Sequence, residues 1–153
     1  MAEDLRQEWG TPRAVFEELR REHAFTVDVC ASPLNRKLDR YLTKADDALA
    51  CSWAGERVFC NPPFVSIDPW LGHALEADLA YFLLPARTFN AWWARWAPQA
   101  ARREWYIGRM RFEPPPGVKP TSVPFPVVGL LFGGDRGPDA YRDAISGKRL
   151  DIK

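Results

Sequence analysis

Short β-prone runs alternate with amphipathic helical segments along most of this chain, and this alternation limits the possible folds more than any other feature. Strands are predicted for residues 25–29, 57–60 and 80–84, which are short apolar runs that stop at turn-forming residues. Helices are predicted for 68–79 and 88–97, where apolar residues recur at helical spacing. This order is typical of an α/β sheet with crossover helices.

A further helix is expected before the first of these strands. Thr11 is a residue type that caps helix N-termini, and Pro12 suits the first helical position. The apolar residues Val15, Phe16 and Leu19 then follow at helical spacing. The sequence therefore predicts a helix that opens with Thr11 as its cap.

The C-terminal part of the chain breaks the alternation. Two β-like runs, 104–112 and 125–132, have no helix between them. They are separated by the proline-rich segment 113–126, which we interpret as a loop. We therefore expect an antiparallel pair of strands at the end of the sheet.

Length and composition favour one globular domain. The chain has 153 residues, of which 46% are hydrophobic, enough to bury a core without disulfides or metal ions. We expect a single domain over 1–153, with 1–8 and about 135–153 peripheral to it. The sequence shows neither a secretory signal nor an apolar run long enough to span a membrane, so we expect a cytoplasmic protein without membrane partners.

Cysteine and histidine usage argues against a metal site. The three cysteines form no CxxC pair, and the two histidines are far apart in the sequence. Neither a disulfide framework nor a zinc site is indicated, and we expect no metal. Each cysteine is interpreted as a small buried hydrophobic residue.

Three of the predicted strands end at residues that can bind a ligand. Asp28, Asn61 and Pro85 each lie where a strand stops. Ligands of open α/β sheets bind at the carboxyl ends of the strands, so we expect three loops to converge on one crevice.

The segment Cys60-Asn61-Pro62-Pro63-Phe64 carries the strongest chemical signal. An exocyclic aromatic amine is a poor nucleophile, because its lone pair is delocalised into the ring. The side-chain oxygen of Asn61 and the carbonyl of Pro62 can accept its two hydrogens, Pro63 helps to fix the loop, and Phe64 offers a face for a flat base. The alternative interpretation is a rigid turn after a strand. Strand alternation directs Cys60 away from Asn61.

This motif, together with others in the same order, resembles the phage-type DNA N6-adenine methyltransferase family (Dam-like). The supporting segments are Trp9-Gly10-Thr11-Pro12, Asp28-Val29-Cys30-Ala31-Ser32, Asn35, Tyr41-Leu42-Thr43, Asp46-Asp47-Ala48-Leu49 with Trp53, and Leu84-Pro85-Ala86-Arg87-Thr88 with Trp92-Trp93. The resemblance covers Trp9 to about Phe132. It implies transfer of a methyl group from S-adenosylmethionine to the N6 amino group of adenine in DNA, in a bacterial cell or phage-infected host and within restriction-modification or a related role.

The resemblance also implies a fold. We expect a Rossmann-like, doubly wound methyltransferase fold with a C-terminal antiparallel pair. Only 32 residues separate Asp28 from Asn61, so the second and third strands of the usual sheet must be shortened or missing.

Most of the cofactor-binding candidates lie before the catalytic motif. They are Trp9, Thr11, Pro12, Asp28, Cys30, Ala31, Asp46, Asp47 and Asn61. Free amides behind Thr11 can bind the carboxylate of the cofactor, and Asp28 can accept from its amino group or ribose. Asp46 and Asp47 remain alternatives for the cofactor's adenine. Each of these residues also has a simpler interpretation as a helix cap or turn residue.

DNA contacts are expected from the C-terminal half. Arg87, Arg109 and Arg111 are candidates for phosphate binding, although a solvated surface with salt bridges also explains such arginines. The loop 113–126 is either a target-recognition segment or a plain surface loop. A last group, Phe89, Trp92, Trp93 and Trp96, falls at helical spacing and is interpreted as core, with a platform for base stacking as the alternative.

Two rival functions remain. The same motif serves amino groups of RNA bases or of a protein glutamine, and a nucleic-acid-binding module without catalysis is the second rival. We favour a monomer that binds DNA and S-adenosylmethionine.

Overall fold

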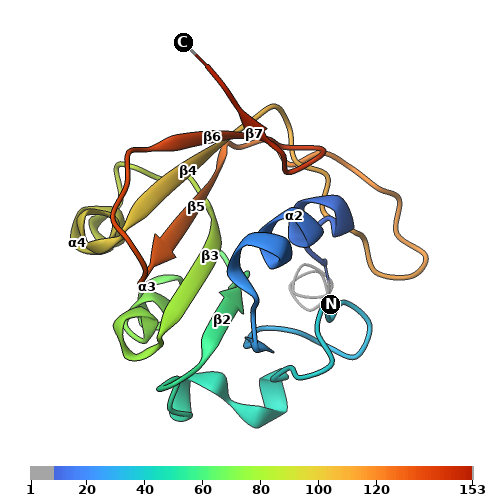
Figure 1. The fold of residues 1–153 in the computed structure, drawn as a ribbon. Helices are drawn as coiled ribbons and strands as arrows, with labels where there is room; N and C mark the ends of the chain where they lie inside the picture. Colours follow the sequence, from blue (N-terminus) through green and yellow to red (C-terminus); the bar gives the residue numbers. More distant parts are fainter. Residues whose placement is uncertain (1–8, 153) are drawn as a thin grey trace.

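The computed structural model describes residues 9–152, and all its strands belong to one seven-stranded sheet (Figure 1). The strands are β1 (Val27–Asp28), β2 (Arg57–Cys60), β3 (Leu79–Pro85), β4 (Arg102–Ile107), β5 (Val127–Phe132), β6 (Ala140–Asp143) and β7 (Arg149–Leu150). The α-helices are α2 (Arg13–His23), α3 (Asp68–Leu71) and α4 (Ala91–Trp96). Four short 3₁₀ helices complete the described elements: η1 (Lys44–Asp46), η2 (Ala48–Ala50), η3 (Ala74–Glu76) and η4 (Ala97–Gln99).

The sheet has the order β1-β2-β3-β5-β4-β6-β7 and mixed strand directions. Strands β1, β2 and β3 are parallel, and β5 is antiparallel to both β3 and β4. Strand β4 therefore runs in the same direction as the first three strands, and its carboxyl end lies at the same edge of the sheet. The mixed α/β architecture expected from the sequence is confirmed.

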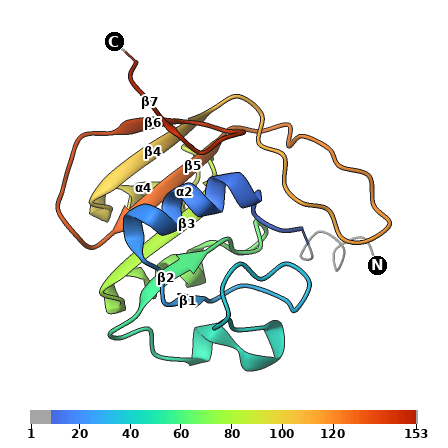
Figure 2. The same ribbon diagram turned by 45° about the vertical axis from the view of Figure 1, so that its right-hand side comes forward.

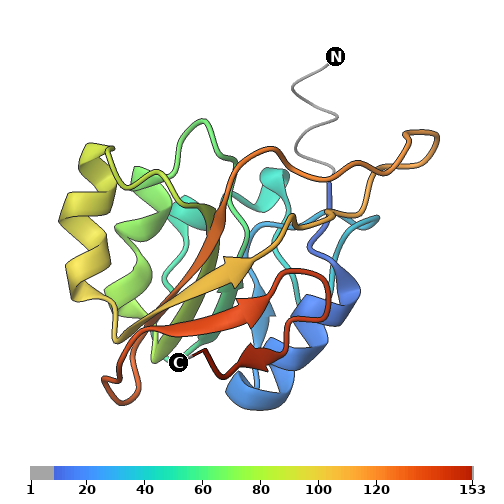
Figure 3. The same ribbon diagram turned by 90° about the horizontal axis from the view of Figure 1, so that it is seen from above.

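Helices cover both faces of the sheet, with α2 on one side and α3 and α4 on the other (Figures 1 and 3). The side chains of each strand alternate between the two cores. On β3, Phe82 and Leu84 pack into the core beneath α3 and α4, whereas Tyr81 and Leu83 pack into the core beneath α2. This period of two is the ordinary geometry of a strand buried on both faces.

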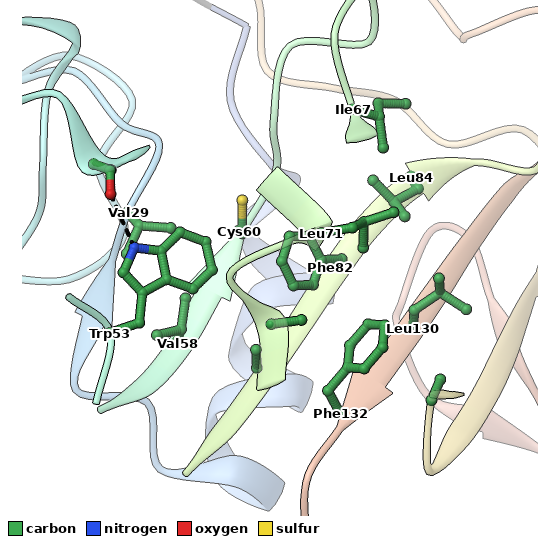
Figure 4. Close-up of a cluster of buried hydrophobic side chains, with 14 of the residues drawn as sticks. Val29, Trp53, Val58, Cys60, Ile67, Leu71, Phe82, Leu84, Leu130 and Phe132 are labelled. Carbon is green, nitrogen blue, oxygen red and sulfur yellow. Dashed lines mark hydrogen bonds between the residues drawn. The ribbon is translucent and has the colours of Figure 1, made fainter. Parts of the chain in front are cut away.

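The core beneath α3 and α4 is rich in aromatic residues (Figure 4). Trp53 is 1% exposed, stacks on Phe82 and donates its indole N–H to the carbonyl of Ala48 at 3.1 Å. This bond satisfies the one polar atom of the buried indole. It also anchors η2, which lies between β1 and β2 in the sequence. Cys60 belongs to the same core, so the prediction of a buried cysteine is confirmed there. Cys30 and Cys51 are only partly buried, so that prediction is wrong for them.

The first helix begins two residues later than the predicted cap. Pro12 occupies the N-cap position of α2, and the side chain of Thr11 makes no capping bond. The carbonyl of Pro12 accepts the amide of Phe16 at 3.0 Å, which is the first helical hydrogen bond. The predicted capping role of Thr11 is wrong, because its hydroxyl is used at the end of β2 instead.

The later helices are shorter than predicted. The segment predicted as one helix over 68–79 forms only α3 and η3, and α3 ends at Gly72, a residue type that does not favour continuation of a helix. The helix predicted over 88–97 begins only at Ala91. Phe89 lies before it and is 87% exposed, so its assignment to the core is wrong.

The predicted antiparallel pair exists, but it is not at the end of the sheet. Strand β5 lies between β3 and β4, and β6 and β7 extend the sheet beyond β4. Residues 108–112, predicted to continue the strand, lie outside β4. The C-terminal segment is therefore less peripheral than expected, because Arg142 on β6 is completely buried. No strand lies between β1 and β2 in the sequence, and Val27 pairs directly with Val58.

Candidate active site

The loops after β1 and β2 meet at the carboxyl edge of the sheet, beside the start of α2. Asp28 ends β1, and Asn61 directly follows β2, which is parallel to β1 and adjacent to it. Gly10 and Thr11 directly precede α2 and line the same recess as Asp28 and Asn61, so the start of α2 also lies at this edge. The structure therefore brings together three segments that are far apart in the sequence (Figure 2).

The side chain of Asn61 is oriented by Thr11. Its amide nitrogen donates to the Thr11 hydroxyl oxygen at 3.1 Å. Thr11 is 5% exposed, so this contact is shielded from water. Because the amide nitrogen is engaged, the side-chain oxygen of Asn61 is the atom available to accept a hydrogen bond.

The backbone carbonyls of the Asn61-Pro62-Pro63-Phe64 loop have different partners. The carbonyl of Pro63 accepts the amide of Ser66 at 3.2 Å, and the carbonyl of Phe64 accepts from the Arg87 guanidinium at 3.1 Å. Among the described residues, no donor contacts the carbonyl of Pro62. The loop thus has two acceptors without a proton donor, the Pro62 carbonyl and the Asn61 side-chain oxygen.

The ring of Phe64 is held by aromatic residues from both ends of the proline-rich loop. It meets Phe112 at a centroid distance of 6.2 Å and an interplanar angle of 73°, and Phe125 at 5.4 Å and 80°. Such edge-to-face contacts fix a ring without covering both of its faces. Phe64 remains partly exposed at the edge of the sheet.

A small recess lies beside Asn61. Its lining residues are Trp9, Gly10, Thr11, Asp28, Cys30, Asn35 and Asn61. Asp28 is 5% exposed, and its carboxylate accepts the backbone amide of Cys30 at 3.3 Å. Burial raises the pKa of Asp28 to about 7, despite this bond and the positive charge of Lys37. A carboxyl group with this pKa is poised to change charge when a cation binds.

The far wall of the recess is tied to the start of the proline-rich loop. The backbone of Gly10 and that of Glu113 exchange two hydrogen bonds of 2.8 Å. The Lys37 ammonium, whose side chain is 4% exposed, forms an ion pair with the Glu113 carboxylate. A Cβ at Gly10 would lie 3.2 Å from the Cβ of Asn35 and 3.3 Å from the Lys37 nitrogen, so the wall is closely packed.

The other cofactor-binding candidates lie in different places. Trp9 and Cys30 line the recess, whereas Pro12 and Ala31 do not. Asp46 and Asp47 are exposed and lie outside the lining. The carboxylate of Asp46 already accepts the backbone amide and hydroxyl of Thr43, at 2.8 Å and 3.0 Å. Asp47 has no side-chain hydrogen bond or ion pair with another described residue, so it has the freer carboxylate.

The three candidate arginines share one edge but differ in their surroundings. Arg87 follows β3, and its guanidinium contacts the Phe64 carbonyl. Arg109 and Arg111 follow β4 and are exposed on either side of the buried Met110. Arg111 donates weakly to Ser122 in the proline-rich loop, at 3.4 Å.

Sequence reasoning missed three residues of this edge. Asn35 and Gly10 line the recess, and Lys37 joins it to Glu113. Asn35 and Gly10 belong to the segments that carry the family resemblance, so they were detectable. The role of Lys37 could not be predicted from the sequence, because its ion-pair partner Glu113 is 76 residues away.

Two negative findings hold within residues 9–152. No group of three or more His, Cys, Asp or Glu residues is arranged to hold a metal ion. None of the helices in this range has the length and apolar character needed to cross a membrane.

Comparison with known proteins gives one family. The family model described as DNA N-6-adenine-methyltransferase (Dam) matches residues 1–124, which is most of the chain and includes every candidate site residue. No match was found among the curated proteins. On the strength of this match, the chain belongs to the DNA N-6-adenine-methyltransferase (Dam) family.

Proposed function

We propose that this protein transfers a methyl group from S-adenosylmethionine to the exocyclic N6 amino group of adenine in DNA. The observation that carries the proposal is the pair of acceptors at the end of β2. The Asn61 side-chain oxygen and the Pro62 carbonyl have no donor among the described residues, whereas the next two carbonyls of the loop are occupied.

This pair of acceptors suits an aromatic amine. When both N–H groups of the amine donate to fixed oxygens, the nitrogen becomes pyramidal and its lone pair leaves the ring. The hydrogen bonds from the amine to the Asn61 oxygen and the Pro62 carbonyl become stronger as positive charge develops on the nitrogen. The ring of Phe64, held by Phe112 and Phe125, supplies a stacking face for the base.

We assign the small recess beside Asn61 to one end of S-adenosylmethionine, because polar groups of the chain line it. The Asp28 carboxylate can accept from the amino group or ribose of the cofactor, and the first amides of α2 can bind its carboxylate. The cofactor supplies an electrophilic methyl group when bound. The recess is smaller than the pockets that enclose whole ligands of this size. We assign Asp47 rather than Asp46 to the adenine end, because Asp46 is engaged with Thr43.

Placement of the cofactor across the carboxyl ends of β1 and β2 corresponds to a Rossmann-like methyltransferase fold. In open α/β sheets, ligands lie at this position. The parallel arrangement of β1 to β3, with helices on both faces, supports this assignment.

DNA is proposed to approach the same edge. Arg109 and Arg111 follow β4, whose carboxyl end is on the side of the sheet that carries Asn61. Both side chains are exposed and can reach phosphate oxygens. The loop 113–126 lies beside them and is proposed to contact the target sequence.

The test is methylation of a random duplex DNA pool with radiolabelled S-adenosylmethionine, followed by mapping of the modified positions. Label on N6 of adenine at a recurring sequence supports the proposal. RNA of random sequence and a glutamine-containing peptide serve as parallel acceptors. Label confined to RNA or peptide would overturn the choice of substrate, and cofactor-binding protein that labels no acceptor would overturn the catalytic assignment.

A further inference from the structure

The most exposed large apolar residues of residues 9–152 gather at the edge that carries the candidate site. Phe89 is 87% exposed, Val65 81% and Leu34 69%. These residues lie in the loops that follow β3, β2 and β1 respectively. The other exposed large apolar residues reach at most 57%. A single exposed apolar residue is ordinary, but a set confined to one functional edge marks a contact surface.

Phe89 is the most exposed of the three, and its backbone is fixed. The amide of Arg87 donates to the carbonyl of Pro85 at 2.8 Å, and the amide of Asn90 donates to the carbonyl of Arg87 at 3.1 Å. These bonds form a tight turn between β3 and α4, with Phe89 near its tip. The ring of Phe89 makes no aromatic contact with any described residue and is absent from both cores.

The same turn is attached to the catalytic loop. The guanidinium of Arg87 donates to the Phe64 carbonyl at 3.1 Å, so the turn and the Asn61–Phe64 segment hold a defined position relative to each other. Phe89 therefore projects into solvent from a rigid support that is joined to the proposed base-binding loop.

We infer that Phe89 enters duplex DNA beside the target adenine and stacks in the space that the adenine leaves. This inference rests on the proposed function and extends it, because it names duplex DNA as the substrate class. An adenine inside a duplex is out of reach, and turning it out costs its pairing and stacking. An apolar side chain inserted at the vacated step recovers part of that stacking. Phe89 has the size, the exposure and the rigid support for this role.

The experiment compares Phe89→Ala with Leu75→Ala on matched substrates. Leu75 is 57% exposed and lies in η3, which precedes the start of β3 and is at the opposite edge of the sheet. Both variants and the parent protein are assayed on unmodified DNA that contains the sequence methylated by the parent. This DNA is supplied as a duplex and as a single strand. Phe89→Ala should lower kcat/KM on the duplex about tenfold or more, the scale of one lost base–aromatic stack.

The single strand provides the internal control, because its adenine is already unstacked. Phe89→Ala should methylate the single strand at close to the parental rate, and Leu75→Ala should match the parent on both substrates. With 2-aminopurine at the target position, the parent should raise the fluorescence of the duplex, and Phe89→Ala should raise it less. Phe89→Trp should restore the signal.

Four results would overturn the inference. An unchanged duplex rate in Phe89→Ala excludes a stacking role, and equal losses on both substrates place Phe89 in general DNA binding. A dimer that is present in the parent and lost in Phe89→Ala, measured by sedimentation, assigns Phe89 to a contact between copies of the chain. If the parent methylates neither substrate, the proposed function itself fails and the inference falls with it.

Discussion

Two regions of this protein bury charged side chains, and they differ in how many hydrogen-bond and charge partners the chain supplies to those side chains. In the first region, the completely buried Arg142 on β6 donates from every guanidinium nitrogen: Nε to Glu104 at 2.8 Å, Nη1 to the Gly147 carbonyl at 2.9 Å and Nη2 to Glu22 at 2.6 Å. In the second, the buried Asp28 carboxylate faces the recess with backbone amides as its hydrogen-bond donors, and its pKa is raised.

The first region is built for stability. The hydroxyl of Tyr81 donates to the Glu104 carboxylate at 2.8 Å and contacts the Tyr106 hydroxyl at 2.8 Å. Gly129 makes room for this arrangement, because a Cβ there would lie 1.9 Å from the Tyr81 oxygen. Burial raises the pKa of Glu22, but its hydrogen bond and charge interaction with Arg142 outweigh this and lower it. Each strong polar group in this cluster has its partner within the chain.

In the second region, the described part of the chain supplies no charged hydrogen-bonding partner for the Asp28 carboxylate. A buried carboxylate without a charged hydrogen-bonding partner costs free energy, and selection retains such a group where a ligand provides the partner. We therefore propose that the difference between the two regions separates polar groups that hold the fold from those that serve a ligand. The following experiments test this separation.

The largest effect is expected from removing Arg142. Arg142→Met leaves the buried Glu104 without its guanidinium, and loss of one partner of a buried ion pair costs about 3–5 kcal/mol of unfolding free energy. Urea denaturation measures this change. A second substitution, Glu104→Leu, should restore part of the stability. A loss below about 1 kcal/mol in Arg142→Met would contradict the structural role of the cluster.

Asn61→Ala should reverse this pattern, with a loss of activity and no loss of stability. The removed acceptor strengthens its bond toward the transition state, so turnover should fall about a hundredfold or more. The melting temperature should stay at the parental value, because Asn61 is not packed in a core. Turnover should fall much more than cofactor affinity, measured on the same sample, although Asn61 also lines the recess. A folded variant that binds both ligands and methylates at the parental rate would exclude Asn61 from catalysis.

Asp28 should make cofactor binding depend on pH. If the cofactor binds the ionised carboxylate, affinity should rise about tenfold per pH unit as the pH approaches about 7, and Asp28→Asn should remove this slope. Calorimetry at several pH values measures both. Equal slopes in the parent and in Asp28→Asn would show that another group titrates.

The raised pKa of Asp28 has the opposite effect on the stability of the ligand-free protein, which should fall as the pH rises. The folded-state pKa of Asp28 lies above its ordinary value of 3.8, so the neutral form is favoured on folding. Its stabilising contribution is complete below about pH 3.8 and is lost as the pH rises through about 7. Asp28→Asn should therefore gain stability relative to the parent at pH 8.

A smaller effect is expected at Thr11, whose hydroxyl orients the Asn61 amide. Thr11→Val keeps the shape but removes the acceptor, and turnover should fall by up to about tenfold, the scale of one neutral hydrogen bond. Thr11→Ser should keep most of the activity. A KM for DNA that rises while kcat stays constant would contradict an effect through Asn61.

The smallest effect is expected for the exposed arginines. Arg109→Ala and Arg111→Ala should each reduce the slope of DNA affinity against salt concentration by about one unit. Arg20→Ala, near the end of α2 that is remote from the site, is the matched control and should leave the slope unchanged. If Arg109→Ala and Arg111→Ala both keep the parental slope, DNA binds at another face.

The sequence predicted those parts of the fold that depend on local patterns. Strand β2 has the predicted bounds, because its apolar run ends at a proline pair that stops the strand. Phe89 was misassigned because helical spacing alone does not reveal that the turn at Arg87 delays the helix to Ala91. Strands β6 and β7 escaped detection, because they are short and an arginine at position 142 reads as a surface residue.

The candidate site divides in the same way. Asn61 to Phe64 and Asp28 could be predicted, because each has a residue type and a strand-end position that match its proposed chemistry. The contact between Thr11 and Asn61 could not, since it joins residues 50 positions apart. The bond from Arg87 to the Phe64 carbonyl was also invisible, because the sequence suggested only a phosphate partner for Arg87.

The backbone pairing of Gly10 with Glu113 has a consequence for how such enzymes can diversify. Two hydrogen bonds and the Lys37 ion pair close the base of the proline-rich loop, and β5 begins at its other end. Val123 packs against the core beneath α2 and donates its amide to the carbonyl of Met110 at 3.0 Å, so it belongs to the fixed part of the loop. The residues from Pro116 to Ser122 belong to neither core and can change in length or composition without altering the sheet or the recess. Exchange of this segment between relatives should transfer sequence preference while the catalytic loop stays untouched.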